Sequence, residues 1–408
     1  MPVATLERTL GPFGASGIGF AAMLGAGAFW VWGPVVERAG AFLLAAIMIA
    51  GVMAVLNALS MAQLAFLAPV SGGAYSYARR HVSPMAGFMA GWFFLSGKTA
   101  SAAAIAVIAA GYLSPDNSRV IAPVMIAVFA AINITGIRST AALGAGVALV
   151  VIGLLVSVSA VAPWSAGELG VAPDTSVYSV WQAAGLMFFA FAGYARMATL
   201  GGEVKNPTVV LPRVIVGTLV AVIILYAFLG TALLSTLGFD GLVGSATPVA
   251  DSVPEEWRGV IIVVAVAASL GSLATILAGL SRTSMAMALE GDLPPRLGVV
   301  WGRTASPAVA EITMASVAIV ISVVLDPLWL VGISSTTVLS YYALAHLAAA
   351  RLPSQDRRLP RVVSWLGLVG CVALVATLPW LPLLTGVCVA LVGVGVWFLF
   401  IRPKHRSG

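Results

Sequence analysis

The sequence predicts an all-α polytopic membrane protein, and three observations carry that prediction. First, 60% of the 408 residues are hydrophobic and only 9% are charged, whereas soluble domains carry about a quarter charged residues. Second, the apolar residues form continuous runs of about 20 residues, the length that a helix needs to cross a bilayer. Third, the basic residues gather in alternate connections between those runs. A water-soluble globular protein is therefore excluded.

Twelve apolar segments qualify as transmembrane helices. Continuous runs favour helices over barrel strands, which would alternate apolar and polar residues in shorter pieces. The expected spans lie near residues 13–36, 40–67, 84–113, 120–136, 140–163, 179–200, 212–236, 258–282, 307–325, 328–350, 362–381 and 383–401.

The basic residues predict the orientation of these spans, because Lys and Arg are retained on the cytoplasmic side. If the N-terminus is inside, most of the 21 Lys and Arg residues fall in cytoplasmic loops, whereas only Arg38, Arg119 and Arg258 fall in the opposite loops. We therefore expect both termini to be cytoplasmic, in the inner or plasma membrane of the cell. This asymmetry and anionic lipid headgroups account for the net charge of +6, so no nucleic-acid partner is expected.

Two of the twelve spans contain a break near their middle. The first span is interrupted by Gly25-Ala26-Gly27, and the sixth has a matching feature in the run from Phe188 to Tyr194, which includes Gly193. Glycine pairs are places where a membrane helix can unwind. Because the two features lie five spans apart, a repeat that relates spans 1–5 to spans 6–10 must be inverted in the membrane. Paired breaks in inverted halves point to the central site of a transporter.

This pattern divides the chain into a cytoplasmic N-terminus (1–12), a first repeat (13–163), a second repeat (164–350), two additional helices (351–401) and a cytoplasmic tail (402–408). Unwound backbone exposes N–H groups from one half-helix and carbonyl groups from the other, which suits a zwitterion with a carboxylate and an ammonium group. The alternative is that Gly25 and Gly27 only let neighbouring helices pack closely.

The loops carry a more specific signal. The run Gly202-Glu203-Val204-Lys205-Asn206-Pro207, followed by Leu211-Pro212-Arg213, resembles the E-V-K-N-P-x-x-x-x-P-R signature of the amino acid–polyamine–organocation (APC) superfamily of permeases. Other motifs of that family are matched in order by Gly25 to Phe29, Pro69 to Tyr77, which the family places at the start of helix 3, Asn133 to Arg138, Ser281-Arg282 with Ala286 to Ala288, and Gly291 to Pro294. The resemblance covers roughly residues 13–350.

The resemblance implies a five-plus-five inverted repeat, with broken helices 1 and 6 around the substrate, helices 11 and 12 outside the repeat, and alternating access. It also implies an amino acid or amine as cargo. Carried over by position, Gly25, Ala26 and Gly27 would bind the carboxylate, and the ammonium and side chain would meet Phe188, Phe191, Ala192 and Gly193. Phe191 is the expected gate, because a large ring beside unwound backbone can cover the substrate; otherwise it is a packing residue.

Two departures from the family pattern limit what can be carried over. The family often has an acidic residue after the break in helix 6, in a G-F-E run, whereas this chain reads Gly193-Tyr194-Ala195-Arg196. Its absence argues against a basic substrate such as arginine or a polyamine. Some members place a lysine in helix 5, where it stands in for sodium, but residues 140–163 contain no ionisable side chain.

Lys98 lies about 20 Å along span 3 by the rise of an α-helix, close to the middle of the membrane. A lysine at that depth is unfavourable unless it faces the protein interior or an aqueous cavity. Because burial favours the uncharged amine, Lys98 is a candidate proton carrier or substitute for a sodium ion. The alternative is a structural lysine that is bonded to carbonyl groups.

The other polar residues within spans carry weaker predictions. Arg196 lies in the cytoplasmic third of span 6, where a structural or gating role is favoured over substrate contact. Ser269 and Ser272 in span 8 could offer oxygen atoms to sodium, although such hydroxyl groups usually bond their own helix. The three histidines, His81, His346 and His405, are far apart and fall at span ends or in the tail, so no metal site is expected.

The sequence therefore predicts a secondary active transporter of amino acids, without enzymatic activity and without a cofactor. A neutral, apolar amino acid is favoured because the expected pocket offers Phe, Met and Ala without a counter-charge. A proton gradient is favoured over sodium as the driving force. Export, exchange and import remain open, as do a sensor with a transporter fold, a polytopic membrane enzyme, and a homodimer formed through helices 11 and 12.

Overall fold

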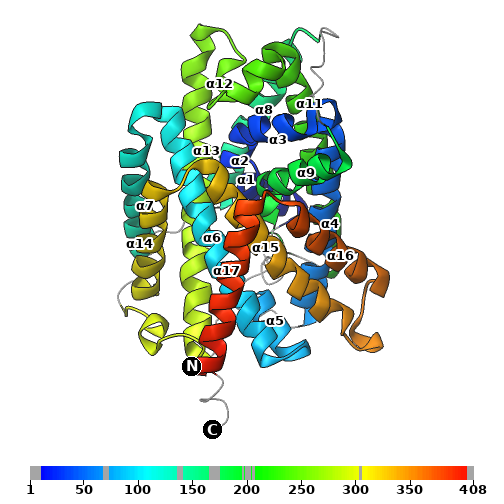
Figure 1. The fold of residues 1–408 in the computed structure, drawn as a ribbon, viewed down its shortest axis with the longest axis vertical. Helices are drawn as coiled ribbons and strands as arrows, with labels where there is room; N and C mark the ends of the chain where they lie inside the picture. Colours follow the sequence, from blue (N-terminus) through cyan, green and yellow to red (C-terminus); the bar gives the residue numbers. More distant parts are fainter. Residues whose placement is uncertain are drawn as a thin grey trace.

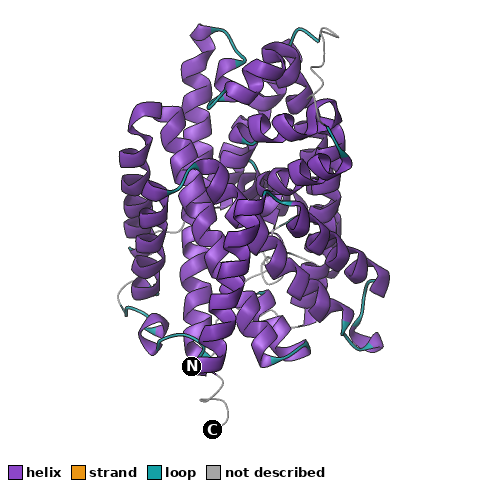
Figure 2. Ribbon diagram, viewed as in Figure 1, coloured by secondary structure: helices purple, strands orange, loops and turns teal. Residues whose placement is uncertain are grey.

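A computed structural model of the chain describes residues 11–67, 73–135, 141–164, 175–194, 197, 204, 207–302 and 306–401. Within these ranges the regular elements are helices joined by loops (Figure 2). The prediction of an all-α fold is confirmed.

The helices follow one another along the chain with short connections. The first half contains α1 (Pro12–Met23), α2 (Ala26–Trp30), α3 (Trp32–Ala39), α4 (Leu43–Leu67), α5 (Ala74–His81), α6 (Pro84–Leu113), α7 (Ser118–Ile134) and α8 (Ala141–Val161). The second half contains α9 (Val177–Phe191), η3 (Ala192–Tyr194), α11 (Pro207–Gly244), α12 (Pro248–Asp251), α13 (Glu255–Leu289), α14 (Ala308–Val324), α15 (Pro327–Ala350), α16 (Arg361–Thr377), α17 (Trp380–Val396) and the π-helical turn η7 (Trp397–Ile401).

These helices make the chain a multi-pass membrane protein. Among the described residues, eight helical stretches are long and apolar enough to cross a membrane, and α14 and α16 are shorter apolar helices. The two remaining expected spans are the interrupted ones, which correspond to α1 with α2 and α3, and to α9 with η3. The expected span 84–113 coincides with α6, and α13 extends beyond the expected 258–282 at both ends. Helix α11 begins before the expected 212–236 but continues past it only after a kink at Gly238, whose φ is 69°.

The break in the first span occurs where the sequence predicts it. Helix α1 ends at Met23, Leu24 and Gly25 leave the helical conformation, and α2 begins at Ala26 with Gly25 in an extended conformation before it. The join between α2 and α3 is not a second break, because Val31 keeps helical dihedral angles and its carbonyl accepts from the Val35 N–H group. Residues 26–39 therefore form a nearly continuous half-helix.

Helix α5 is an element that the sequence did not predict as separate. The segment from Pro69 to Tyr77 was expected to lead directly into helix 3, but Ala74–His81 forms its own short helix after Gly73, whose φ of 56° favours glycine. The transmembrane helix α6 then starts anew at Pro84, and the Ser83 side chain caps it by accepting from the Ala86 N–H group.

Helix α6 runs through the centre of the molecule. In its apolar stretch 83% of the residues are buried, compared with 17% in the stretch Pro115–Ile134 that contains α7. Helices α13 and α15 pack along α6, while α7 and α14 pair on one side and the tilted α16 lies on the other (Figure 1). The two interrupted helices, α1 to α3 and α9, contact each other beside this central group.

Candidate functional site

The two helix breaks lie against each other, backbone to backbone. A methyl group at Gly27 would lie 2.6 Å from the Cα atom of Ala190, and one at Gly193 would overlap the carbonyl group of Ala22. Such contacts leave no room for a Cβ atom, so glycine is needed at both positions for these two segments of the backbone to approach this closely. The structure thus brings together the residues that the sequence singled out from two distant segments.

Gly25 faces a different neighbour, the helix α13. A side chain at this position would overlap the hydroxyl group of Ser272. Ser272 is 6% exposed and its Oγ atom has no hydrogen-bond partner. A buried polar atom without a partner is uncommon and unfavourable in proteins. The Ser272 hydroxyl group is therefore available to a polar ligand at the break in helix 1.

Tyr226 on α11 joins the two breaks, and sequence analysis did not single it out. Its hydroxyl group lies 3.2 Å from the carbonyl oxygen of Met23 and 3.1 Å from that of Ala190, so its single proton is shared between these two acceptors. The side chain is fully buried. A single tyrosine in an apolar run carries no periodicity or motif, so only the fold reveals that its hydroxyl group reaches both interrupted helices.

Lys98 reaches the break in helix 6 from the central helix α6. Its ammonium group donates a hydrogen bond of 3.3 Å to the carbonyl oxygen of Ala192, the first residue of η3. The lysine is 7% exposed. The expectation that it faces the protein interior is confirmed, and its partner is a carbonyl group rather than a carboxylate.

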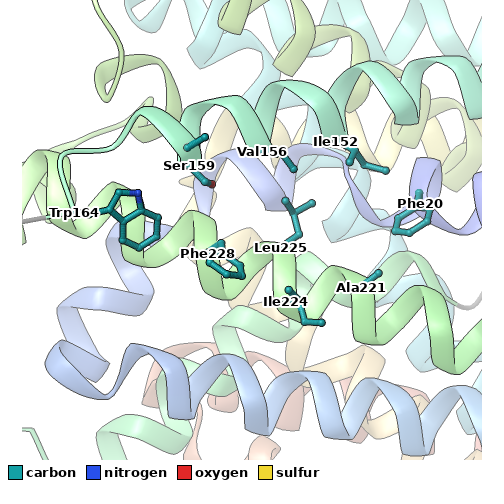
Figure 3. Close-up of a pocket in the computed structure, with 10 residues that line it drawn as sticks. Phe20, Ile152, Val156, Ser159, Trp164, Ala221, Ile224, Leu225 and Phe228 are labelled. Atoms are coloured by element: carbon teal, nitrogen blue, oxygen red, sulfur yellow. The ribbon is translucent and has the colours of Figure 1, made fainter.

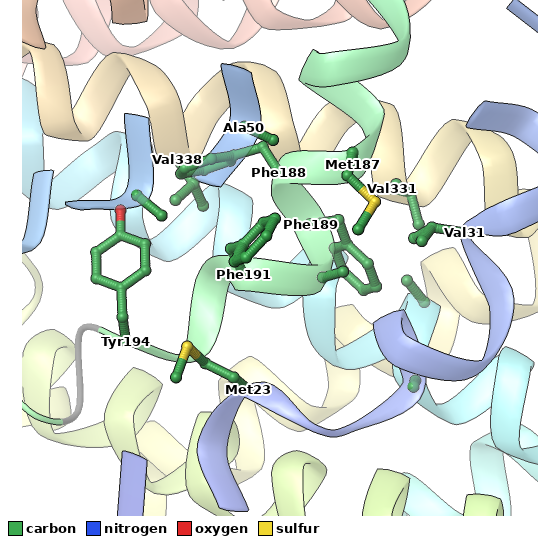
Figure 4. Packing of buried hydrophobic residues seen from close by; sticks show 14 of the residues in the cluster. Met23, Val31, Ala50, Met187, Phe188, Phe189, Phe191, Tyr194, Val331 and Val338 are labelled. Carbon is green, nitrogen blue, oxygen red and sulfur yellow. The ribbon is translucent and has the colours of Figure 1, made fainter. Parts of the chain in front are cut away.

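Aromatic rings fill the space around the break in helix 6 (Figure 4). Phe191 is fully buried, and its ring meets that of Tyr226 edge-on with centroids 5.2 Å apart. Phe188 meets Tyr194 and Tyr342 in the same way, at 6.3 and 6.2 Å. The expected role of Phe191 as a gate stays a prediction.

The remaining predicted site residues have different outcomes. The hydroxyl group of Ser269 donates to the carbonyl oxygen of Ala265 in its own helix, which is the alternative that the sequence left open for it. Ala26 and Ala192 are buried at their respective breaks. Arg196 and most of the signature from Gly202 to Asn206 lie outside the described residues.

Comparison with known proteins identifies the family. The family model described as amino acid permease matches residues 10–406. The chain belongs to the amino acid permease family. The members to which it is similar are membrane transporters and not enzymes, so the alternative of a polytopic membrane enzyme is excluded.

Individual relatives support this assignment. An uncharacterized transporter of Mycobacterium tuberculosis is 37% identical over 401 residues, covering 96% of this permease and 91% of the relative. The branched-chain amino acid permease BcaP of Bacillus subtilis is 25% identical, with 99% and 95% covered, and the serine/threonine exchanger SteT of the same organism is 25% identical, with 84% and 83% covered.

A solved structure shares the fold of the permease. The crystal structure of a mutant manganese transporter from Eremococcus coleocola aligns with a TM-score of 0.60 at 14% sequence identity, covering 99% of this chain and 98% of that chain. At this identity the likeness concerns the fold alone.

A buried polar cluster ties α16 of the permease to its core. The Oδ1 atom of Asn57 on α4 accepts from the thiol group of Cys371 at 3.2 Å and lies 2.7 Å from Nε2 of His346. Since Oδ1 can only accept, Nε2 carries the proton of the imidazole. His346 lies near the end of its span as expected, and its side chain is fully buried. Isolated polar residues in separate spans gave no sign that they would meet.

A second polar cluster lies outside the membrane-spanning helices. It joins α5 to the residues that follow α13. Asp292 is 3% exposed and accepts from the guanidinium group of Arg79 at 2.7 Å and from the hydroxyl group of Tyr75 at 2.8 Å. Burial and the adjacent Asp292 carboxylate raise the pKa of Tyr75, so its hydroxyl group stays protonated and keeps donating. The cluster holds α5 against the end of α13.

A hollow of about 560 Å³ lies between α1, α8 and α11, and it is distinct from the helix breaks (Figure 3). Its walls are almost entirely apolar, and the lining residues Trp164, Ile224 and Phe228 are about half exposed. An apolar hollow without a charged group does not match an ammonium and a carboxylate. Polar backbone groups that match these charges lie at the helix breaks and not in this hollow.

Proposed function

We propose that this permease is a secondary active transporter that moves neutral, apolar amino acids across the cytoplasmic membrane by alternating access. The observation that carries this proposal is the close pairing of the two helix breaks, with the unpartnered hydroxyl group of Ser272 directed at Gly25. Paired breaks at the centre of the bundle place ends of half-helices where a substrate can meet them.

The amino acid carboxylate belongs at the break in helix 1. The backbone N–H groups of Gly25, Ala26 and Gly27 lie at the start of a half-helix that continues to Ala39, and a helix N-terminus favours an anion. The Ser272 hydroxyl group adds a neutral donor beside Gly25. Binding of a carboxylate would give this buried hydroxyl group the partner that it lacks.

The ammonium group of the substrate belongs at the break in helix 6. There the carbonyl group of Ala192 accepts a hydrogen bond from a cation already, the Lys98 side chain. A carbonyl oxygen at the end of a half-helix carries partial negative charge and favours such a group. Residues around this break that the sequence proposed for the same role are Phe188, Phe191, Ala192 and Gly193.

The surroundings of the breaks favour an apolar side chain on the substrate. Met23, Phe188, Phe189 and Phe191 are buried there, and the described residues place no carboxylate among them. A basic side chain would lack a counter-charge, whereas an aliphatic one gains from leaving water. The name of the relative BcaP, a branched-chain amino acid permease, agrees with this class.

Coupling to a proton gradient through Lys98 is part of the proposal, with Arg196 as an accessory gating residue. Sodium bound by Ser269 and Ser272 is less favoured, because the hydroxyl group of Ser269 is already bonded within its helix. We further propose cytoplasmic termini, as the distribution of basic residues predicts. The purified permease would show whether helices 11 and 12 form a homodimer.

Counterflow in proteoliposomes tests the proposed function without assuming a coupling ion. Vesicles loaded with unlabelled leucine should take up labelled leucine, and external isoleucine, valine or methionine should compete more strongly than arginine or glutamate. Gly25→Ala should abolish the exchange, because its methyl group overlaps Ser272. Gly271→Ala is the matched control, since Gly271 is the neighbour of Ser272 on α13 and faces open space. Strongest competition by arginine would refute the apolar substrate, and a monodisperse permease that exchanges no amino acid would refute the transport function.

A further inference from the structure

The ammonium group of Lys98 occupies a position that the substrate also requires. Its 3.3 Å hydrogen bond ends on the carbonyl oxygen of Ala192, at the start of the break in helix 6. Lys98 is buried, and among the described residues no charged side chain acts on it. The carbonyl oxygen is thus the polar partner that the structure gives to this buried cation.

The ionisable side chains on the helices around α6 are engaged elsewhere or lie toward the helix ends. On α15, His346 is bonded to Asn57 and the Tyr341 hydroxyl group accepts from the N–H group of Ala74. On α14, Glu311 accepts from Asn133, near Arg282 of α13. Others on the elements that contact α6 are Tyr342 on α15, Glu255, Glu256 and Arg258 on α13, Tyr75, Tyr77, Arg79, Arg80 and His81 on α5, Asp116 in the turn before α7 and Arg119 on α7, and α6 itself carries Tyr112. None of them supplies a counter-charge to Lys98.

The carbonyl oxygen has two lone pairs, so it is charge repulsion that opposes two ammonium groups bound to it at once. The substrate brings a second positive charge to within a few ångströms of Lys98, and without an anion between them the repulsion in a water-poor site is large. A lysine can respond by giving up its proton, because a neighbouring like charge disfavours its charged form. An arginine at the same position could not respond in this way, since its guanidinium group keeps its proton in proteins.

We propose that Lys98 and the substrate ammonium group compete for the Ala192 carbonyl oxygen, so that the permease exchanges one amino acid for one proton. This inference rests on the proposed function and adds the mechanism, stoichiometry and direction of its proton coupling. When the substrate binds, one N–H bond of the Lys98 ammonium breaks, the amine keeps the electron pair, and the proton passes to water on the side from which the substrate came. When the substrate leaves on the opposite side, the amine takes a proton from that side and returns to the carbonyl oxygen.

The direction of transport follows from this cycle. The proton moves opposite to the amino acid, and because the zwitterion is neutral, one positive charge crosses the membrane per turnover. In a cell with an inward proton gradient and a negative interior, both forces drive the proton inward and the amino acid outward. The structure therefore assigns the permease to export, whereas symport of a proton would make it an importer.

The first test is the polarity of the gradient that drives uptake. Proteoliposomes containing the wild-type permease are clamped at zero potential with potassium and valinomycin, and net uptake of labelled leucine is followed with the lumen more acidic or less acidic than the outside. An acidic lumen should drive accumulation, by about tenfold at equilibrium for one pH unit. An interior-positive potential should add to the uptake. Uptake driven by an acidic exterior, or insensitive to both gradients, overturns the proposal.

The second test uses two substitutions with opposite expectations. Lys98→Met removes the competing cation, so uptake should lose its dependence on lumen pH and the KM for leucine should fall. Lys98→Arg keeps a permanent cation at the carbonyl oxygen, so leucine binding and uptake should be lost. A purely structural lysine predicts the reverse order, with arginine tolerated and methionine damaging. Thr99→Val is the control, because Thr99 is buried beside Lys98 and bonds only its own helix at Leu95.

The outcomes separate failure of this inference from failure of the proposed function. Leucine counterflow between vesicles and medium of equal pH reports transport alone, and its absence in the wild type would refute the proposed function. Wild-type counterflow combined with acid-exterior stimulation would keep the transporter and refute the antiport. If size-exclusion chromatography shows that a Lys98 variant is misfolded, the wild-type gradient measurement still decides the question.

Discussion

The hydroxyl group of Tyr226 donates toward the carbonyl oxygen of Ala190 at 3.1 Å, and the same hydroxyl group lies 3.2 Å from the carbonyl oxygen of Met23. One side chain of α11 thereby contacts the last turns of both interrupted helices. Carbonyl groups at helix ends lack partners within the helix, so Tyr226 supplies from a third helix what the two breaks remove. The relative position of the breaks depends on a hydrogen bond as well as on glycine packing.

Tyr226→Phe should weaken both the fold and transport. The substitution keeps the ring contacts with Phe191 and Trp32 but removes the one hydroxyl donor that the two buried carbonyl oxygens share, which costs about 1–3 kcal/mol. We expect a lower melting temperature in detergent and a higher KM for leucine in counterflow. Thr231→Val on the same helix is the control, because Thr231 bonds only the Ala227 carbonyl oxygen. Equal KM values for wild type and Tyr226→Phe would show that the hydroxyl group does not position the breaks.

Gly193→Ala should be among the most damaging small substitutions in the chain. Its methyl group would overlap the Ala22 carbonyl group, and backbone atoms cannot move aside as a flexible side chain can. Overpacking of this kind costs about 1–3 kcal/mol or more, and we expect loss of counterflow even where some protein still folds. Gly217→Ala on α11, which faces open space, should retain activity and stability. Normal transport by Gly193→Ala would mean that the two breaks are farther apart than described.

The sequence was sufficient for the fold class and for the positions of the breaks. Apolar runs reveal spans because a helix satisfies its own backbone groups in lipid, and Gly25, Gly27 and Gly193 mark places where the backbone closely approaches another helix of the same chain. The start of α11 and both ends of α13 were missed, because a helix can continue past the apolar run into polar residues such as Glu255 and Glu256. Helix α5 was missed for a related reason: eight residues are too few to show a period.

The contacts of the site were harder to predict than its position. Lys98 was identifiable because a charge in an apolar run is conspicuous, but nothing in the sequence indicates that Ala192 is its partner. Tyr226 and Ser272 are ordinary residues of apolar helices, and their importance arises only when α11 and α13 pack against the breaks. The pairing of Asn57 with His346, 289 residues apart in sequence, likewise depends on tertiary structure.

Asn57→Ala should loosen the attachment of α16 to the core. It removes the acceptor for both His346 and Cys371 and leaves a buried N–H group unpaired, at a cost of about 1–3 kcal/mol. We expect a lower melting temperature and faster hydrogen exchange in Arg361–Thr377, measured by mass spectrometry. Asn117→Ala is the matched control, because Asn117 makes an exposed hydrogen bond to Ser114. Unchanged exchange in α16 would show that its packing, including the contact of Gly367 with the His346 ring, is sufficient.

Asp292→Ala should release α5 from the end of α13. The carboxylate is fully buried as a side chain and holds Arg79 at 2.7 Å, with Arg79 itself 19% exposed. Removing one partner of a buried ion pair costs about 3–5 kcal/mol, and the partial exposure of Arg79 to solvent reduces that figure. Tyr75→Phe removes only one neutral donor from the same carboxylate, so its effect should be about 1 kcal/mol. Melting temperatures should therefore fall in the order wild type, Tyr75→Phe, Asp292→Ala. In Asp292→Ala, α5 keeps only its packing against α6 and α15, so protease should cleave Ala74–His81 before the membrane helices unfold. If cleavage of α5 and unfolding of the membrane helices occur together, Asp292 stabilises the whole fold and not only the attachment of α5.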